Sequence, residues 1–168
     1  MIQAKKAIPH IGYQQTKKYY DICVIVLGAD ARTTPVPIAI DTEVNAAQKT
    51  TLVGFGNEDV YSTVGFGTKR EVNVDITSIR RFPSQNLDAD EVRYGYESDL
   101  EFVAGGKGFD SCNGDSGGPA YIIVDGVRKL AGLTSRATDG ASNPCGEGGI
   151  YTRVDAFTEF IYGLVPKT

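Results

Sequence analysis

Residues 112–119 read Cys-Asn-Gly-Asp-Ser-Gly-Gly-Pro and hold a serine among three glycines. Because glycine has no Cβ, this backbone can turn sharply and approach another molecule closely. In such a turn the N–H groups of Gly114 and Ser116 can point into one small space, where they would hold the negative oxygen that forms when a hydroxyl attacks a carbonyl. Surface turns are also rich in Gly, Asp and Ser, but turn composition alone rarely produces the whole pattern. The stretch therefore predicts Ser116 as a nucleophile.

The stretch resembles the nucleophile loop of the chymotrypsin/trypsin family of serine peptidases. Four further segments resemble family segments in the right order: residues 8–13 (Ile-Pro-His-Ile-Gly-Tyr), 20–27 (Tyr-Asp-Ile-Cys-Val-Ile-Val-Leu), 53–56 (Val-Gly-Phe-Gly) and 149–154 (Gly-Ile-Tyr-Thr-Arg-Val). The resemblance implies an all-β fold, the trypsin-like double Greek-key β-barrel with a C-terminal α-helix. We expect residues 1–34 to be the remnant of a partial first barrel and residues 35–168 to form a complete second barrel.

The resemblance begins part-way through the family's domain. The chain has 168 residues, whereas all-β domains of this kind run to roughly 200–250 residues, and it has neither the family's Ile-Val-Gly-Gly start nor the Ala-Ala-His-Cys segment that carries the triad histidine. His10 is the only histidine and precedes Asp21, as the triad order requires, but it matches a different family segment. We therefore expect a surface histidine at a strand end, with His10 as general base the alternative. A truncated domain without its general base should be inactive alone.

The resemblance implies a hydrolase, a serine endopeptidase active in proteolysis. Ser116 would attack the scissile carbonyl, Asp21 would orient the triad histidine, and the N–H groups of Gly114 and Ser116 would form the oxyanion hole. Asp115 would pair with the new N-terminal ammonium that cleavage of a zymogen creates. The alternative is a non-catalytic binding module that keeps the fold without the chemistry.

Asp110 lies six residues before Ser116, where the family places the floor of its primary specificity pocket. A buried carboxylate is costly unless it is paired, and an arginine or lysine of the substrate would be its partner. We expect trypsin-like cleavage after Arg or Lys; the alternative is an exposed loop aspartate. The resemblance adds Ser135, in the segment that pairs with substrate as an extra strand, and places Ala137 and Gly149 on the pocket wall. Arg136 departs from the family, which usually has an aromatic residue there.

The chain has three cysteines, so one pair and one odd thiol is the simplest arrangement. The resemblance implies a disulfide between Cys112 and Cys145. Cys23 lies in an apolar run, where a free cysteine usually behaves as a small buried hydrophobe. A disulfide indicates an oxidising compartment and hence a secreted protein.

The composition excludes several other classes of function. The net charge of −4 argues against nucleic-acid binding, and no apolar run is long enough to span a membrane. One histidine and scattered cysteines form no ligand cluster, so we expect no metal and no cofactor. The expected partners are polypeptide substrates with Arg or Lys and, in addition, proteinaceous inhibitors.

The local patterns predict strands joined by Gly- and Pro-rich turns. Alternation at Val72, Val74 and Ile76 indicates a half-buried strand, and residues 22–27 read as a buried one. Asp125-Gly126 suits a type I′ turn and predicts a hairpin between residues 121–124 and 130–134. Residues 32–37 read as a linker. The spacing of the last apolar residues predicts one amphipathic helix with Asp155 as its N-cap; these residues are Ala156, Phe157, Phe160, Ile161 and Leu164.

Overall fold

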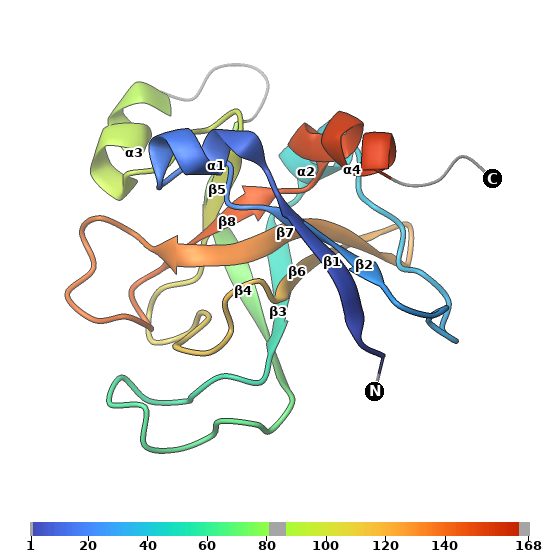
Figure 1. The fold of residues 1–168 in the computed structure, drawn as a ribbon. Helices are drawn as coiled ribbons and strands as arrows, with labels where there is room; N and C mark the ends of the chain where they lie inside the picture. The colour runs from blue at the N-terminus through green and yellow to red at the C-terminus, as the bar shows by residue number, and fades with distance from the viewer. Residues whose placement is uncertain (1, 81–86, 165–168) are drawn as a thin grey trace.

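The computed structural model describes residues 2–80 and 87–164. Eight strands carry most of the structure, and Figure 1 labels them in chain order: β1 Ala4–Pro9, β2 Cys23–Leu27, β3 Lys49–Gly54, β4 Arg70–Ser78, β5 Glu101–Ala104, β6 Pro119–Val124, β7 Val127–Ala137 and β8 Gly149–Arg153. The helices are short: α1 Ile11–Thr16, α2 Asp41–Ala46, α3 Leu87–Tyr94 and α4 Thr158–Leu164, the last preceded by a 3₁₀ turn at Asp155–Phe157. None of the helices in the described ranges is long and apolar enough to cross a bilayer.

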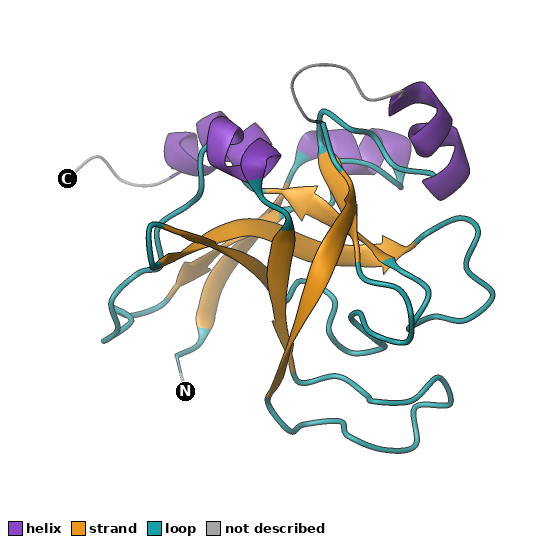
Figure 2. Ribbon diagram, turned by 180° about the vertical axis from the view of Figure 1, so that it is seen from behind, coloured by secondary structure: helices purple, strands orange, loops and turns teal. Residues whose placement is uncertain are grey.

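Six strands close into a barrel in the order β3-β4-β5-β8-β7-β6. Every neighbouring pair is antiparallel, and the β3–β6 pairing, which sets Leu52 opposite Ala120, closes the cylinder. Strands β1 and β2 form a separate two-stranded sheet. Figure 2 shows the helices gathered at one end of the strands and long loops at the other. This mostly β architecture with a short C-terminal helix confirms the predicted trypsin-like fold; the domain limits at residues 34 and 35 remain a prediction.

The barrel interior is filled by side chains from all six strands. Phe102 of β5 and Tyr151 of β8 are both fully buried and stack with ring centroids 5.4 Å apart. A Cβ at Gly132 of β7 would lie 2.6 Å from the Phe102 ring, so only glycine fits beside it. The expected alternation in β4 is confirmed, because Val74 and Ile76 are buried while their neighbours are exposed. A packed interior of this kind is what closure of a six-stranded barrel requires.

The predicted hairpin is confirmed at the β6–β7 connection. Val124 pairs with Val127, and the two residues between them, Asp125 and Gly126, have φ values of 49° and 78°. Positive φ at both central positions is the signature of a type I′ turn, whose twist matches that of the flanking strands. Asp-Gly therefore forms the turn that its residue types favour.

The prediction that Cys23 is buried was wrong. Cys23 is a free, exposed cysteine, and β2 alternates between exposed and half-buried residues instead of being buried throughout. Cys23, Ile25 and Leu27 point to one face of β2 and all three are exposed, so this face of the two-stranded sheet is not covered in the described chain. Only Ile22, just before the strand, is fully buried.

The C-terminal helix is confirmed, but two details of its prediction were wrong. Val154, not Asp155, is the N-cap of the 3₁₀ turn, and it makes no side-chain cap bond. The Asp155 carboxylate instead accepts from the buried Arg153 guanidinium, with Nη2 to Oδ2 at 2.6 Å. Ala156 is exposed, while Phe157 is buried. Because the Asp155 carboxylate is engaged in this ion pair, it does not cap the helix.

Candidate active site

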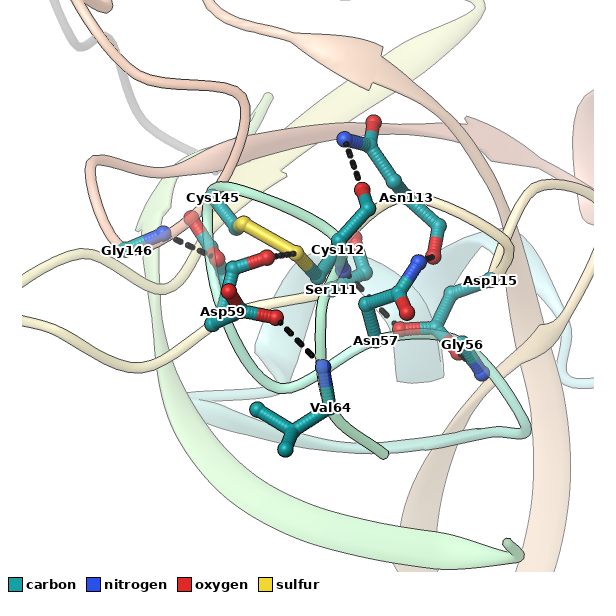
Figure 3. Close-up of a disulfide and its surroundings, with 12 residues drawn as sticks. Gly56, Asn57, Asp59, Val64, Ser111, Cys112, Asn113, Asp115, Cys145 and Gly146 are labelled. Carbon is teal, nitrogen blue, oxygen red and sulfur yellow. Dashed lines mark hydrogen bonds between the residues drawn. A yellow bond between two sulfur atoms is a disulfide. The ribbon is translucent and has the colours of Figure 1, made fainter. Parts of the chain in front are cut away.

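The loop of residues 105–118 is held in place by two independent restraints (Figure 3). The predicted disulfide is present: Cys112 and Cys145, with Cα atoms 4.8 Å apart, join loop 105–118 to loop 138–148. The Asp115 carboxylate accepts from the N–H of Gly56 at 2.7 Å and from the N–H of Cys112 at 2.9 Å. The carboxylate thus fixes the loop against the start of loop 55–69.

The two glycines of Gly54-Phe55-Gly56 are required by this contact. A Cβ at Gly54 would overlap the Asp115 carboxylate, and one at Gly56 would lie 2.7 Å from both Asp115 Oδ1 and the carbonyl oxygen of Asn113. Contacts this short are not tolerated by a Cβ. The absence of a Cβ at Gly54 and Gly56 therefore allows the Asp115 carboxylate to reach the backbone of this segment.

Ser116 is exposed and lies near the end of loop 105–118, three residues before β6. Within residues 2–80 and 87–164 no hydrogen bond engages its hydroxyl. It borders a hollow of about 520 Å³ that is also lined by Gly114, Phe55 and Tyr121. Gly114 has a φ of 96°, and a Cβ there would press on the Phe66 ring and on Gly56 Cα at 3.1 Å. Its N–H has no partner in the described chain either, so the donor and the hydroxyl are both available to a ligand.

Asp21 meets β7 across more than a hundred residues of sequence. The Ser135 hydroxyl donates to Asp21 Oδ2 at 2.8 Å. Asp21 lies just before β2, so this bond attaches the β1–β2 sheet to the barrel. Two of the expected site residues, Asp21 and Ser135, are thereby brought into direct contact.

Asp110 is half-buried and lies two residues before Cys112 of the disulfide. Its two oxygens accept from the N–H groups of Gly146 and Gly148, the latter at 2.7 Å. Burial raises the pKa of the Asp110 carboxyl, and these two N–H donors partly counteract that rise. Asp110 and Asp115 both line a hollow of about 350 Å³. The geometry gives a carboxylate that is reachable from a cavity yet poorly solvated.

The neighbours of Asp110 include a polar pair that the sequence did not reveal. Ser111 Oγ lies 3.0 Å from the Tyr151 hydroxyl. Burial raises the pKa of that Tyr151 hydroxyl, so it stays protonated and can donate. A Cβ at Gly149 would lie 2.8 Å from the same hydroxyl oxygen, which explains the glycine. Ala137 pairs with Gly149 across β7 and β8, so the two expected wall residues lie side by side.

Arg136 makes the most extensive side-chain network in this part of the chain. Its guanidinium binds the Glu101 carboxylate through both terminal nitrogens, with Nη2 to Oε2 at 2.9 Å. It also donates to the carbonyl oxygens of Lys18 and Gly95, at 3.2 and 3.0 Å, and its Cζ lies 5.5 Å from the centre of the Tyr19 ring. Glu101 is fully buried. The departure from the family at Arg136 is therefore matched by an acidic partner, which pattern reading missed because it lies 35 residues away.

His10 directly follows β1, at a strand end as expected, but it is half-buried and not a surface residue. Its Nδ1 accepts from the N–H of Gly12 at 3.1 Å and so caps helix α1. Its ring stacks on Tyr20 at 5.2 Å and meets the edges of Phe157 and Phe160. These aromatic partners come from both ends of the chain, so the local sequence around His10 could not predict them. One ring nitrogen of His10 is thus engaged in capping, and its ring is engaged in three aromatic contacts.

Comparison with known proteins identifies the family of this chain. The sequence model of the family described as Trypsin matches residues 1–161. Kallikrein 1-related peptidase b1 of Mus musculus is 35% identical over 84% of this chain and 52% of its own length, and Trypsin of Saccharopolyspora erythraea is 29% identical over 90% and 63%. Glucanase inhibitor protein 4 of Phytophthora infestans is 32% identical over 70% of the chain and 44% of its own length.

The chain therefore spans between 44% and 63% of the length of these relatives. The family match covers nearly every described residue, including the barrel, the disulfide and the loop that carries Ser116. The resemblance stated from the sequence is confirmed, and the chain belongs to the trypsin-like serine protease family.

Proposed function

We propose that this chain carries the nucleophile and the specificity pocket of a serine endopeptidase that cleaves after Arg or Lys. The observation that supports this most is that one loop, tied by a disulfide, holds both an exposed Ser116 and a half-buried Asp110. The first offers a hydroxyl to a substrate carbonyl, and the second offers a charge to a substrate side chain. A surface turn without function has no physical reason to combine them.

In the proposed reaction Ser116 Oγ forms a bond to the scissile carbonyl carbon while its proton passes to a histidine base. The carbonyl oxygen becomes an oxyanion, which the N–H groups of Gly114 and Ser116 would stabilise. Asp21 would hold that histidine in the correct tautomer and stabilise its charged form. The bond from Ser135 to Asp21 Oδ2 orients the carboxylate and leaves its other oxygen for the imidazole. The acyl-enzyme then forms as the amine leaves with the transferred proton.

Asp110 would select the substrate. Its carboxylate already accepts two backbone N–H bonds but forms no ion pair with a described residue. A guanidinium or ammonium entering the pocket would supply the missing charge, and small Ala137 and Gly149 would leave room for it. Ser135 would pair with the substrate backbone as an added strand.

We also propose that the chain alone is a poor peptidase. His10 is engaged in capping and stacking, so it does not suit the role of base, and without a base the Ser116 hydroxyl stays protonated. Asp115 would further require an N-terminal ammonium from zymogen cleavage to replace or supplement its two N–H donors. The disulfide suits secretion into an oxidising compartment. Proteinaceous inhibitors would be partners of the same cleft.

The second candidate function is a non-catalytic binding module. It is favoured by the relative named Glucanase inhibitor protein 4 and by the occupied His10. Both candidates keep the pocket at Asp110, but only the peptidase needs a reactive Ser116.

The two functions are separated by measuring ligand binding and serine reactivity on the same protein. An aromatic amidine should bind the chain in calorimetry, and Asp110→Ser should abolish binding, while Asp139→Ser, which removes an exposed acid from loop 138–148, should not. Affinity should increase as the pH rises through the raised pKa of Asp110, because only the carboxylate pairs with the cation.

A fluorophosphonate supplies the second readout, with Ser116→Ala as its control. Labelling of Ser116, strengthened when a histidine-bearing first-barrel segment is joined to the chain, supports the peptidase. Amidine binding with no labelling in either form supports the binding module. Amidine binding that is unchanged in Asp110→Ser contradicts the proposed specificity.

A further inference from the structure

The dipeptide Asn113-Gly114 is the only Asn-Gly in the sequence, and it lies directly before the proposed reaction centre. An asparagine side chain followed by glycine can be attacked by the backbone nitrogen of that glycine, because no Cβ shields the nitrogen. We propose that Asn113 is a site of spontaneous deamidation and isomerisation that acts on the oxyanion loop. The modification itself does not depend on the proposed function; only its consequence for the serine does.

The local structure leaves the reacting groups accessible. Asn113 and Gly114 are both exposed, and the Gly114 N–H has no hydrogen-bond partner in the described chain. The φ of 96° at Gly114 places it outside any helix or strand ladder. In a helix or a strand ladder this N–H would donate a hydrogen bond to a carbonyl oxygen, whereas here it has no such partner in the described chain. The same availability that would let Gly114 bind an oxyanion lets its nitrogen act as the nucleophile.

The chemistry needs only water. The Gly114 nitrogen loses its proton and bonds to Asn113 Cγ, and the side-chain amide leaves as ammonia, which closes a five-membered succinimide. Water then adds to one of the two ring carbonyls and breaks its bond to the ring nitrogen. Opening at the backbone carbonyl gives isoaspartate, and opening at the side-chain carbonyl gives aspartate. No oxidant or cofactor takes part.

Three hydrogen bonds hold Asn113 in place and should slow this reaction (Figure 3). Asn113 Nδ2 donates to Ser62 Oγ at 3.1 Å, which holds the side-chain amide toward loop 55–69. The Asn113 carbonyl oxygen accepts from the N–H of Asn57 at 2.8 Å and from its Nδ2 at 3.0 Å. Ring closure requires the side chain to rotate away from Ser62. Removing the Ser62 hydroxyl should therefore speed the reaction.

The modification would change the site in two ways. Isoaspartate inserts one extra carbon into the backbone between Asn113 Cα and Gly114 N, so the Gly114 N–H moves from its position. Either product also places a new carboxylate beside Asp115, next to the space where a negative oxygen would form. Both changes oppose stabilisation of an oxyanion. The loop would thus carry its own slow inactivation step.

The test follows the intact chain during incubation at mildly alkaline pH, with peptide mapping by mass spectrometry and isoaspartyl methyltransferase labelling. Asn113 should convert several-fold faster than Asn57 and Asn73, which precede Glu and Val. Asn143 should not convert by this route because Pro144 has no N–H to attack. Ser62→Ala should accelerate conversion at Asn113 alone, and Asn113→Gln should suppress it.

Two results would overturn the proposal: conversion at Asn113 no faster than at Asn57, or a product without isoaspartate. Fluorophosphonate labelling of fresh and aged protein tests the consequence, which predicts a loss of labelling in proportion to conversion. Full labelling of converted protein would reject the effect on the oxyanion loop. If fresh protein is not labelled at all, the proposed peptidase fails, yet the mass measurement still decides whether Asn113 is modified.

Discussion

The six-stranded barrel and the two-stranded β1–β2 sheet contain similarly apolar segments but bury them very differently. All four residues of β5 are buried, as are all five of β8. In β2 no residue is fully buried, and Ile25 is 57% exposed. A closed barrel surrounds its inward side chains, whereas a two-stranded ribbon can cover only one of its faces. Apolar sequence alone therefore does not determine burial; it also depends on what covers each face, as Tyr96 and Tyr94 cover Val103 and Ile150.

The β1–β2 sheet is held to the barrel by a few polar and aromatic contacts instead of a shared core. Asp21 accepts from Ser135 on β7, and Arg136 donates to the Lys18 carbonyl oxygen. His10 and Tyr20 pack against Phe157, beside the C-terminal helix. The carboxylate proposed for catalysis thus depends on this attachment for its position. The two regions should respond differently to the same kind of substitution.

The largest expected difference is between Phe102→Ala in the barrel and Ile25→Ala in the β1–β2 sheet. Phe102 is fully buried and stacked on Tyr151, so its truncation should lower the free energy of unfolding by about 3–5 kcal/mol. Ile25 is mostly exposed, and its truncation should change stability by less than about 0.5 kcal/mol. Urea unfolding monitored by circular dichroism measures both. Equal losses would show that the β1–β2 sheet has a core of its own.

The second expected effect concerns the Arg136–Glu101 ion pair, which lies within the barrel and whose arginine also donates to the Lys18 carbonyl oxygen, ahead of β2. Arg136→Met leaves the fully buried Glu101 without its cation, which should cost about 3 kcal/mol, at the lower end of the range for breaking a buried pair. Glu101→Met added to Arg136→Met should restore much of this loss. Hydrogen exchange should quicken in β1 and β2, because the Lys18 contact is lost as well.

Arg128→Met is the matched control for this pair. Arg128 faces Glu71 at 3.6 Å with both side chains about half exposed, so its loss should cost under about 0.5 kcal/mol. If Arg136→Met were equally mild, or if the double variant were no more stable than the single one, the inference that the buried Glu101 carboxylate depends on Arg136 would be wrong.

Local patterns predicted those features that depend on neighbouring residues. The Asp125-Gly126 turn and the alternation of β4 follow from conformational preference and from period two, and both were found. The error at Cys23 arose because a run of apolar residues does not state how many strands will flank it. The short helices α1, α2 and α3 were not predicted, since none is long enough to show helical periodicity.

The contacts that build the candidate site could not be predicted from local patterns because they join distant segments. Gly56 and Asp115 are 59 residues apart, and Ser135 and Asp21 are 114 apart. The resemblance to a known family supplied Asp110, Ser116 and the disulfide, but it was silent where this chain departs from the family. The Glu101 partner of Arg136 and the capping role of His10 became evident only in three dimensions.

The smallest expected effect is at His10, the other junction between the two regions. His10→Ala removes a helix cap and an aromatic stack. The free energy of unfolding of the protein should therefore fall by about 1–2 kcal/mol. His10→Asn keeps a cap acceptor but loses the ring, so it should retain part of that stability. Urea unfolding gives the size of each change, and hydrogen exchange in α1 and α4 shows where it occurs.

Lys6→Ala, on the exposed β1 strand, is the control and should leave both measurements unchanged. Loss of protection confined to α1 in His10→Ala would mean that the histidine only caps its own helix. Loss in α4 as well would show that the aromatic contacts with Phe157 and Phe160 hold the two ends of the chain together. Since Asp21 follows Tyr20 directly, the second outcome would also make His10 a support for the carboxylate that the proposed reaction needs.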